Sequence, residues 1–593
     1  MSRNDEIATL LEEFADLLDA KGVEYKPRAY RRAAENIRDY PGAIEGLAAD
    51  GEERVGEIDG VGDAISSKVV EYVETGEIEE LTELREELPV EMDALTAVEG
   101  VGPKSVGKLY EALGITTLDE LEAAAEAGEI QEVSGFGAKT EQNILDNIDF
   151  AREAHERSLL GEARPYGDRI REYMADGDAV DRCALGGSIR RWRPTIGDVD
   201  VLVASRDPAA VIERFGDWDE LDRVIESGET KASAYADDVR VDLRIVVPEE
   251  FGAALQYFTG SKDHNVAVRN RAIDRDLKVN EYGVFGEVRS TSSSRTQSDD
   301  DVAGVEDDDQ RAGERVAGET EEGVYEALGM QWMPPELREN RGEVAAAAEG
   351  TLPDLLGEGD IRGDLHTHTD WSDGSTTVEE LVAGAADFGH DYLAISDHAT
   401  GPGMVGGVGV PDDELREQIE AVEAVAADAD VDVFTGVEAN IAEDGSISVA
   451  DDLLADLDVV VASPHAALDG DGTDRLVAAA EHPHVNVVGH PTGRYLNRRP
   501  GLDVDVERLA EAAADHDTAL EINANPARLD LSGHAVKRAI ESGATVVINT
   551  DAHSPRDFEL VRYGVHTARR GWAEAGDVLN TRDAAGVREF LDG

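Results

Sequence analysis

The sequence has one cysteine, no long hydrophobic run and few basic residues. Cys183 has no second cysteine in the chain with which to form a disulfide or a multi-cysteine zinc site. No apolar stretch approaches the ~18 residues of a membrane span, and the first residues lack the basic and apolar zones of a signal peptide. We therefore expect a soluble, cytoplasmic protein with no membrane partner.

The shortage of positive charge is the most unusual feature of the composition. The chain has 129 acidic and 55 basic residues, which gives a formal net charge of -74. Taken alone, this charge argues against nucleic acid as a partner. However, the acidity is spread over every segment while 41% of the residues are hydrophobic, which is typical of a halophilic protein with a packed core. At about 1 M salt the Debye length is only ~3 Å, so the net charge does not exclude DNA binding.

The length of 593 residues predicts about four structural units, and the first part of the chain has helical periodicity. Three segments, residues 58–70, 98–110 and 133–145, each place Gly-x-Gly between an apolar residue and a new helix. This pattern is typical of helix-hairpin-helix motifs, in which a glycine turn presents backbone N–H groups to a phosphate. An ordinary helix connection would explain one copy, whereas three copies favour contacts with the DNA backbone that do not read its sequence. The glycines expected there are Gly60, Gly62, Gly100, Gly102, Gly135 and Gly137.

From residue 151 the pattern changes to mixed α/β, and three carboxylates stand out in it. The two-residue period of a strand puts Asp198 and Asp200 on one face, and it puts Asp242 of a second strand on a face that could adjoin them. Neighbouring carboxylates repel one another unless cations hold them, and two Mg²⁺ or Mn²⁺ ions would do so. This arrangement suits two-metal nucleotidyl transfer. The residues expected to hold a triphosphate beside the metals are Gly187, Ser188 and Arg191.

Residues 286–323 are polar and acidic and contain almost no large apolar side chains. A segment of this composition cannot bury a core, so we expect a disordered or surface insertion here and no site. Order is expected to return at Val324.

From about residue 355, short apolar strands alternate with helical stretches, which predicts a parallel barrel or barrel-like sheet. Imidazole and carboxylate side chains recur where these strands end, and a barrel gathers its active site there. Mixed ligands of this kind suit Zn²⁺, Mn²⁺ or Fe²⁺, and their number is enough for more than one ion. Such a cluster activates water and neutralises phosphate oxygens, as phosphoester hydrolysis requires. The candidate ligands are His366, His368, Asp373, His398, Glu438, His465, His490, Asp551 and His553.

Other polar residues of the same region do not follow the strand ends. The remaining histidines are expected in the core or at the surface: His390, His482, His484, His516, His534 and His566. Arg494, Arg569 and Arg570 are either phosphate contacts or ordinary solvated arginines.

The glycine turn and the three aspartates make the chain resemble DNA polymerase family X, which includes DNA polymerase beta. The stretch YFTGSKDHNVAVR and the later KVNEYGVF extend the match. Another nucleotidyltransferase, acting on RNA or small molecules, is the narrower alternative, and the helix-hairpin-helix segments count against it. The further roles that the resemblance implies are a sugar-discriminating turn at Tyr257, Phe258 and Gly260, a nucleotide contact at Asn265, and template contacts at Arg269 and Tyr30.

The N-terminal segment resembles the lyase subdomain of the same family, through RAYRRAA around Tyr30 and GVGDAISSK, which ends at Lys68. Lys68 lies where the Schiff-base lysine of the family would be, and such a lysine attacks an aldehyde only when it is unprotonated. Ala64 stands where the family has a companion lysine. A nucleophile and an ordinary solvated lysine therefore both remain open at Lys68.

The C-terminal strand ends resemble the polymerase and histidinol phosphatase (PHP) domain, whose trinuclear metal site uses nine ligands of these types in this order. The resemblance implies three Mn²⁺, Zn²⁺ or Fe²⁺ ions, a 3′-5′ exonuclease, and endonuclease activity at abasic sites. A polymerase followed by a PHP domain is the order found in the bacterial and archaeal branch of family X.

These patterns together predict a multidomain fold. We expect a helical, lyase-like DNA-binding domain with the first helix-hairpin-helix in residues 1–90, and a fingers-like region with two more in 91–150. An α+β nucleotidyltransferase palm and thumb are expected in 151–345, and a distorted (β/α)7 PHP phosphoesterase barrel in 355–593.

The predicted function is a DNA-directed DNA polymerase that fills short gaps in base excision repair and trims 3′ ends with a metal-dependent nuclease. Its substrates would be gapped or primed DNA and deoxynucleoside triphosphates, and a monomer is the default. One alternative is a small-molecule phosphoesterase docked to DNA by an inactive polymerase half. The other is a DNA-binding scaffold in which neither site turns over.

Overall fold

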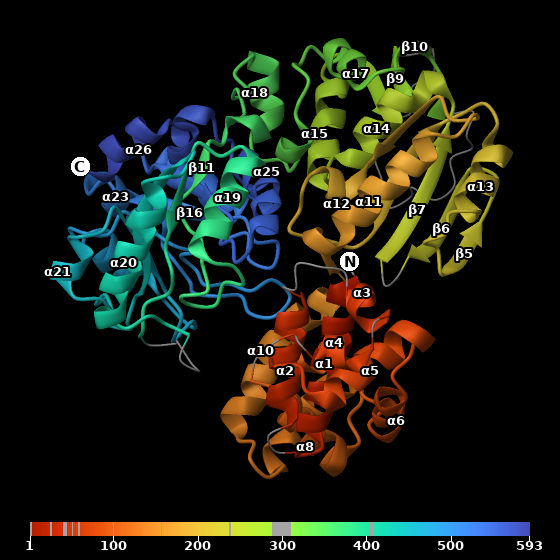
Figure 1. Cartoon of the computed structure of the whole chain (residues 1–593). Helices are drawn as coiled ribbons and strands as arrows, with labels where there is room; N and C mark the ends of the chain where they lie inside the picture. Colours follow the sequence, from red (N-terminus) through yellow and green to blue (C-terminus); the bar gives the residue numbers. More distant parts are fainter. Residues whose placement is uncertain are drawn as a thin grey trace.

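Three lobes make up the structure: a helical N-terminal lobe, a mixed α+β lobe, and a C-terminal lobe that contains the end of the chain (Figure 1). The structure is a computed structural model. It describes residues 3–592 except 24–25, 39–43, 50, 57, 59, 99, 156, 237–238, 287–309 and 402–407. In the ranges described, no helix has both the length and the apolar character needed to cross a bilayer.

The N-terminal lobe is all-helical within its described residues, as the periodicity predicted. Residues of the two segments 1–90 and 91–150 share a single hydrophobic core, which runs from Ile7 to Ile148. The helices are α1 (Arg3–Ala20), α2 (Lys26–Arg38), α3 (Ile44–Ala49), α4 (Glu52–Val55), α5 (Asp63–Thr75), α6 (Glu79–Glu87), α7 (Met92–Thr96), α8 (Pro103–Leu113), α9 (Leu118–Glu126) and α10 (Ala138–His155).

The palm is a five-stranded sheet in the order β2-β4-β7-β6-β5, in which β4 and β7 run parallel and the other neighbours are antiparallel. Val199, Val201 and Val203 of β4 belong to the core beneath helix α11 (Leu160–Ala175), whereas Leu202 packs against α14 (Phe251–Thr259) on the other face. The strand bounds are β2 (Arg182–Leu185), β4 (Val199–Ala204), β5 (Arg223–Ser227), β6 (Lys231–Ala236) and β7 (Val239–Val246).

The thumb contains a small antiparallel sheet in the order β10-β9-β8, together with α15 (Lys262–Ile273) and α17 (Glu321–Ala327). Its strands are β8 (Leu277–Asn280), β9 (Gly283–Gly286) and β10 (Glu314–Ala317). In the last part of 286–323, β10 pairs with β9 and its residues are mostly exposed, which fits the surface alternative of the prediction. The prediction is wrong at Glu321, which is buried at the start of α17. Residues 287–309 of that segment lie outside the described residues.

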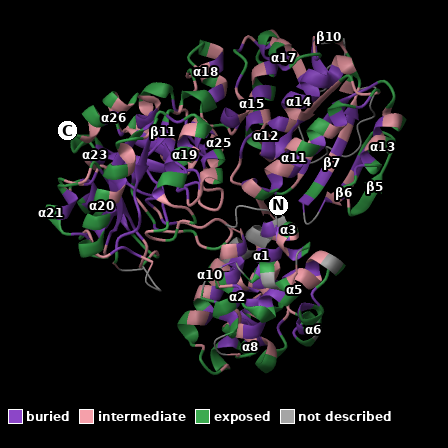
Figure 2. Cartoon of the chain, in the orientation of Figure 1, coloured by how far each residue is buried: buried purple, intermediate pink, exposed green. Residues whose placement is uncertain are grey.

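The C-terminal lobe is a seven-stranded parallel sheet whose spatial order, β11 to β17, follows the chain. A bridge between Thr367 and Ala552 joins the two ends of the sheet, so that the barrel is nearly closed and the predicted fold class is confirmed. The strands are almost wholly buried under their helices (Figure 2). They are β11 (Gly363–Asp364), β12 (Tyr392–Ile395), β13 (Asp432–Asn440), β14 (Val459–Ser463), β15 (Val487–Val488), β16 (Ala519–Asn523) and β17 (Val546–Asn549). The main helices are α19 (Val378–Phe388), α20 (Asp412–Ala426), α22 (Thr473–Ala480), α23 (Val506–Asp515), α24 (Gly533–Glu541), α25 (Val561–Arg570) and α26 (Ala584–Leu591).

Candidate active sites

The three palm aspartates lie on one face of the sheet. Asp200 of β4 is directly opposite Asp242 of β7 in the parallel register, and Asp198 stands just before β4. Burial, together with the charges of Asp198 and Asp242, raises the pKa of Asp200 to about 7. Burial and the charge of Asp242 also raise the pKa of Asp198. Three carboxylates held so close together make a site that gains free energy by binding cations.

The turn before helix α12 (Gly187–Arg190) is pressed against Asp200. Gly187 has a φ of +57°, and a Cβ there would lie 1.8 Å from Oδ2 of Asp200. The N–H of Gly186 donates to the carbonyl of Asp200 at 2.8 Å. Only glycine combines this backbone conformation with so close an approach. The turn and the aspartates therefore form one unit, with Ser188 in the short helix that follows.

Arg191 is nearly buried and is positioned by several groups. Its Nε donates to Glu339 at 2.9 Å and its Nη1 donates to the carbonyl of Thr259 at 2.7 Å. Burial alone would raise the pKa of Glu339, but the charges of Arg570 and Arg191 outweigh it and bring that pKa to about 2. The C-terminal lobe takes part as well, because Arg570 of α25 donates to the carbonyl of Arg191 at 2.7 Å.

The remaining predicted nucleotide residues and Arg269 lie on or just after α14 and on α15, whereas Tyr30 lies on α2 of the N-terminal lobe. The rings of Tyr257 and Phe258 meet edge to face at 5.2 Å. Asn265 donates from Nδ2 to the carbonyls of Tyr257 at 2.7 Å and Gly260 at 3.2 Å, so it supports this turn directly. Arg269 is exposed on α15.

The glycines of the three helix-hairpin-helix segments have the expected geometry. The first glycine of each pair is left-handed, with φ of +72° at Gly60, +82° at Gly100 and +99° at Gly135. Gly62 and Gly102 cap the N-termini of α5 and α8 with extended backbone, and Gly137 immediately precedes α10. Each turn thus leads straight into a helix N-terminus, where unpaired N–H groups can bind phosphate.

Tyr30 is buried in the N-terminal lobe, and Lys68 is partly buried there. The ring of Tyr30 is buried and stacks on Phe14 with centroids 4.5 Å apart. Nζ of Lys68 lies 2.5 Å from Oε2 of Glu80. Burial lowers the pKa of Lys68, but the bond to Glu80 and the nearby negative groups outweigh it and raise that pKa. A raised pKa keeps the amine protonated, which is unfavourable for a Schiff-base nucleophile.

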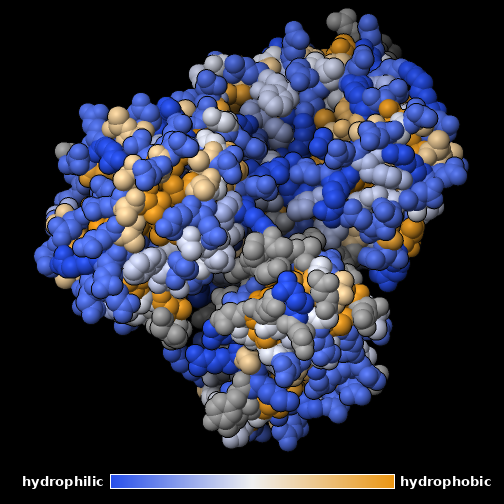
Figure 3. Space-filling view, in the orientation of Figure 1, coloured by the Kyte–Doolittle hydropathy of each residue, from blue (hydrophilic) through white to orange (hydrophobic). Residues whose placement is uncertain are grey.

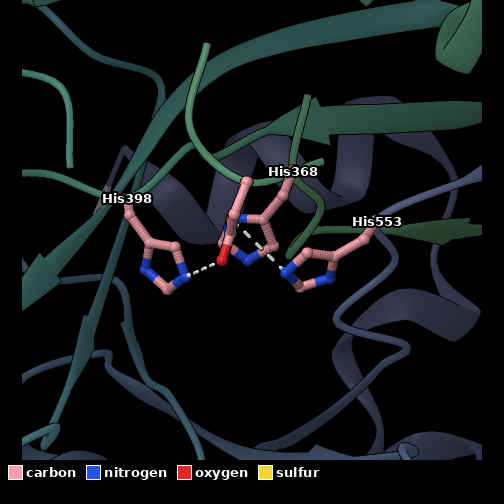
Figure 4. A group of neighbouring side chains, drawn as sticks. His368, His398 and His553 are labelled. Carbon is pink, nitrogen blue, oxygen red and sulfur yellow. Dashed lines mark ion pairs between the residues drawn. The ribbon is translucent and has the colours of Figure 1, made fainter. Parts of the chain in front are cut away.

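All nine candidate ligands of the C-terminal lobe come together at the carboxyl ends of its strands. Glu438 is central: its oxygens lie within 4.0 Å of ring nitrogens of His366, His368, His398, His465 and His490. Asp551 Oδ1 lies 3.1 Å from Nε2 of His368. On the outer side, Asp373 is 3.4 Å from both His398 and His553, which flank His368 (Figure 4).

The arrangement of these side chains suits coordination of metal ions better than hydrogen bonding between the side chains. Three groups of them, His368-Asp373-His398-His553, His366-His368-Glu438 and His398-Glu438-His465, have ligand atoms within 4.8 Å of one another. Among the described residues, buried atoms of the cluster find no hydrogen-bonding partner, which is costly unless a metal ion takes their lone pairs. They are Nε2 of His366, both ring nitrogens of His368, Nδ1 of His398, Oε2 of Glu438, Nε2 of His465 and Nδ1 of His490.

A carboxylate beneath the cluster was missed by the sequence reasoning. Glu521 of β16 is fully buried, and Oε1 lies 2.7 Å from Nδ1 of His366 while Oε2 accepts the N–H of His490 at 2.6 Å. Asn440 meets Nδ1 of His465 at 2.8 Å in the same way. The contacts at Nδ1 of His366 and His465 turn the opposite nitrogen, Nε2, toward the metal groups, whereas His490 is held by Glu521 through its backbone N–H. The sequence signal that could have identified Glu521 is a charged residue between the apolar Leu520 and Ile522 of a buried strand.

Arg494, Arg569 and Arg570 are not ordinary solvated arginines, because each is held by protein oxygens: Arg494 by the carbonyl of Arg528, Arg569 by Glu336, and Arg570 by Glu339. His566 is a partly buried residue at the contact between the C-terminal lobe and the palm, outside the metal groups. It stacks on Trp192 of the palm at 3.6 Å and binds Glu336 and Glu358 at 2.7 and 3.0 Å.

Family models match most of these regions. The match is to a helix-hairpin-helix domain over residues 2–78, a SAM-like helix-hairpin-helix tandem over 92–149, the DNA polymerase beta thumb over 254–339 and a PHP domain over 364–535. The fold and both constellations thus define a polymerase of the beta type joined to a PHP domain.

Similarity to curated proteins extends over the whole chain. A protein of Bacillus subtilis (strain 168) named DNA polymerase/3′-5′ exonuclease PolX is 33% identical over 598 residues, which covers 99% of this chain and 99% of that one. DNA polymerase lambda of Rattus norvegicus is 23% identical over 57% of this chain and 56% of its own length. A probable phosphatase of Thermoanaerobacter sp. (strain X514) matches 38% of the chain at 28% identity and covers 93% of its own length. The chain belongs to the PolX family, the family X DNA polymerases that carry a PHP domain.

Proposed function

We propose that this chain is a repair enzyme that extends DNA primers in its palm and removes nucleotides from 3′ ends in its PHP barrel. The observation that carries the polymerase half is the glycine turn packed against Asp200, which lies on one face of the sheet with Asp198 and Asp242. The observation that carries the nuclease half is the buried cluster of unsatisfied imidazole and carboxylate atoms.

The palm aspartates would hold Mg²⁺ or Mn²⁺, which lower the barrier to attack by a 3′-hydroxyl and stabilise the departing pyrophosphate. Asp198, Asp200 and Asp242 offer the oxygen ligands that such ions prefer. Arg191, positioned by Glu339 and Thr259, supplies positive charge beside the aspartates, where a triphosphate would lie.

The PHP ligands would hold three ions of Mn²⁺, Zn²⁺ or Fe²⁺, which activate water for phosphoester hydrolysis. Glu521 and Asn440 fix the ring orientation of two of the histidines. Endonuclease cleavage at abasic sites is a second reaction of the same cluster, because it breaks the same type of bond.

The substrates are gapped or primed DNA and deoxynucleoside triphosphates, and the biological setting is base excision repair by a monomer. The three glycine turns support backbone contacts with a duplex that are independent of its sequence. A lyase step at Lys68 is not part of the proposal, because Glu80 stabilises its protonated form.

A labelled primer on a one-nucleotide gap tests both halves together. Reactions contain about 1 M KCl and Mn²⁺, with and without nucleotides, because the acidic composition favours high salt. Asp198→Ala and Asp200→Ala should abolish extension and leave 3′ trimming intact. His366→Ala and Asp551→Ala should do the reverse.

Two outcomes would contradict the proposal. Unchanged extension after loss of the aspartates would remove the polymerase assignment. Extension without any 3′ trimming by the wild-type chain would leave the PHP cluster as a hydrolase of other phosphates, such as small phosphomonoesters.

A further inference from the structure

Two loops at the mouth of the PHP barrel bring together cationic and aromatic side chains that the sites described above do not use. The loops follow β15 and β16. The group, here named the mouth cluster, consists of Tyr495, Arg498, Arg499 and Arg528.

The mouth cluster borders the metal ligands. Nε of Arg528 lies 3.7 Å from Oδ2 of Asp551, and the two side chains are 20% and 8% exposed. The guanidinium of Arg528 is thus partly exposed to solvent, and it lies next to the nearly buried metal ligand Asp551. A phosphate that reaches the metal groups from solvent on this side would pass within reach of Arg528.

Tyr495 adds an aromatic surface between two arginines. The guanidinium carbons of Arg498 and Arg528 each lie 5.6 Å from the centre of its ring. Aromatic rings next to arginines are what proteins use to bind single-stranded nucleic acid, since a base stacks on the ring while the arginines meet phosphates.

The arginines of the mouth cluster form few ion pairs, although the charge of Arg498 lowers the pKa of Glu162 against the larger effect of burial. In the described ranges neither Arg498 nor Arg499 forms an ion pair with an acidic side chain, and Arg528 pairs with Asp551 alone. Burial and the neighbouring charge of Arg528 lower the pKa of Arg499. Arg499 donates from Nε and Nη2 to the carbonyl of Gly493 at 3.1 and 2.7 Å, so Arg498 and Arg528 are the cations of the cluster that can meet an anionic ligand.

The backbone of the mouth cluster is fixed in place. The N–H of Tyr495 donates to the carbonyl of Arg499 at 2.8 Å, and the N–H of Leu496 donates to the carbonyl of Ala527 at 2.7 Å. Nε of the buried Arg494 donates to the carbonyl of Arg528 at 2.8 Å. These bonds join the two loops and hold Tyr495 and Arg528 on the same side of the mouth.

The same loop touches the palm beside the polymerase site. Nδ2 of Asn497 donates to the carbonyl of Arg157 at 2.6 Å, and Arg157 donates to the carbonyl of Thr195 at 2.6 Å. Arg157 is close enough to Asp198 for its charge to lower the pKa of that aspartate, against the larger effect of burial. The mouth cluster therefore lies on the side of the barrel that faces the palm. The seam between the C-terminal lobe and the palm is mostly hydrophilic on the face seen in Figure 3.

We propose that Tyr495, Arg498 and Arg528 bind the last nucleotides of a single-stranded DNA 3′ end that leaves the palm for the PHP site. Arg528 meets the phosphate nearest the metal groups, and Tyr495 stacks on a base. The proposal rests on the proposed nuclease function and names the residues that bind the strand at the mouth of its site.

Photo-crosslinking of the full chain tests this assignment without turnover. A single-stranded oligonucleotide with 4-thiothymidine at its 3′ terminus is irradiated with the protein in EDTA and about 1 M KCl, and the attached peptides are identified by mass spectrometry. We expect attachment within residues 490–500 or 524–530. The same terminus paired in a duplex should attach about fivefold less.

Matched variants separate binding from folding. Tyr495→Ala and Arg528→Met should each lower the yield about tenfold, and Tyr495→Phe should restore most of it because the ring is retained. Arg508→Met is the control, because Arg508 of helix α23 is exposed and pairs with Asp474 of helix α22. Yields of Tyr495→Ala and Arg528→Met within twofold of wild type would overturn the assignment, as would attachment only outside these loops.

Failure of the proposed function is read out separately. If the wild-type chain with Mn²⁺ trims no 3′ end but the crosslinks appear as expected, the nuclease function fails and the binding site stands. If trimming occurs and the crosslinks lie elsewhere, the nuclease function stands and the mouth cluster is not its strand-binding site.

Discussion

The contact between Gly187 and Asp200 makes a single added methyl group a sharp test of the polymerase site. In Gly187→Ala, the new Cβ would lie 1.8 Å from Oδ2 and 2.9 Å from Cγ of Asp200. A φ of +57° costs a non-glycine residue about 1 kcal/mol, and the carboxylate or the turn must also move by more than about 1 Å to relieve the clash. Misplacing a reacting group by about 1 Å can lower a rate about 100-fold.

We therefore expect Gly187→Ala to lower kcat for single-nucleotide gap extension about 100-fold or more. Extension is measured on a labelled primer in about 1 M KCl with saturating nucleotide, and 3′ trimming by the same preparation shows that the chain is folded. Gly216→Ala is the matched control, because a Cβ there meets no heavy atom within 4 Å. Extension by Gly187→Ala within about threefold of wild type would refute the reasoning, since it would mean that the turn and the aspartate do not act as one unit.

Three further predictions concern stability and salt. Arg570→Met removes one partner of a buried ion pair with Glu339 and should lower the free energy of unfolding by about 3 kcal/mol, measured by urea denaturation, whereas the exposed Arg508→Met should cost less than about 1 kcal/mol. Burial lowers the pKa of His390 to about 4, so between about pH 6.5 and pH 4 the unfolded chain binds a proton that the folded chain does not. The free energy of unfolding therefore decreases as the pH is lowered through that window. When the pH is lowered from 7.5 to 5, the free energy of unfolding of the wild-type chain should fall by about 2 kcal/mol more than that of His390→Phe. The same shift of the urea midpoint with pH in both chains would contradict this. Gap extension should persist when KCl is raised from tenths molar to about 1 M, and its loss would count against both the halophilic interpretation and binding through backbone amides and metals.

The parts of the sites that could be predicted from sequence depend on local periodicity. The two-residue period of β4 and β7 is enough to place Asp198, Asp200 and Asp242 on one side, because alternate side chains of a strand always share a face. The glycine turns could be found for a similar reason, since the positive φ at Gly60 and Gly100 is a local demand of the turn.

The errors share a different cause. Residues 310–323 were expected to be disordered or on the surface because they are acidic, yet Glu321 is buried between Arg190 and Arg338, with ion-pair distances of 2.7 and 2.5 Å. Arg190 and Arg338 are 131 and 17 positions away from Glu321 in the sequence. Composition alone therefore misjudged a segment whose charge is neutralised by distant partners.

By itself, the sequence determined the three kinds of lobe, the metal-binding character of both sites and the family, because strand period, glycine turns and ligand order are written along the chain. Tertiary structure alone decided which groups support those sites and how the lobes meet. Glu521 beneath His366, Arg570 against Arg191, and Asn497 against Arg157 join residues that are from 155 to 379 positions apart. Contacts of this kind depend on how whole lobes pack, and no local pattern in the sequence carries that information.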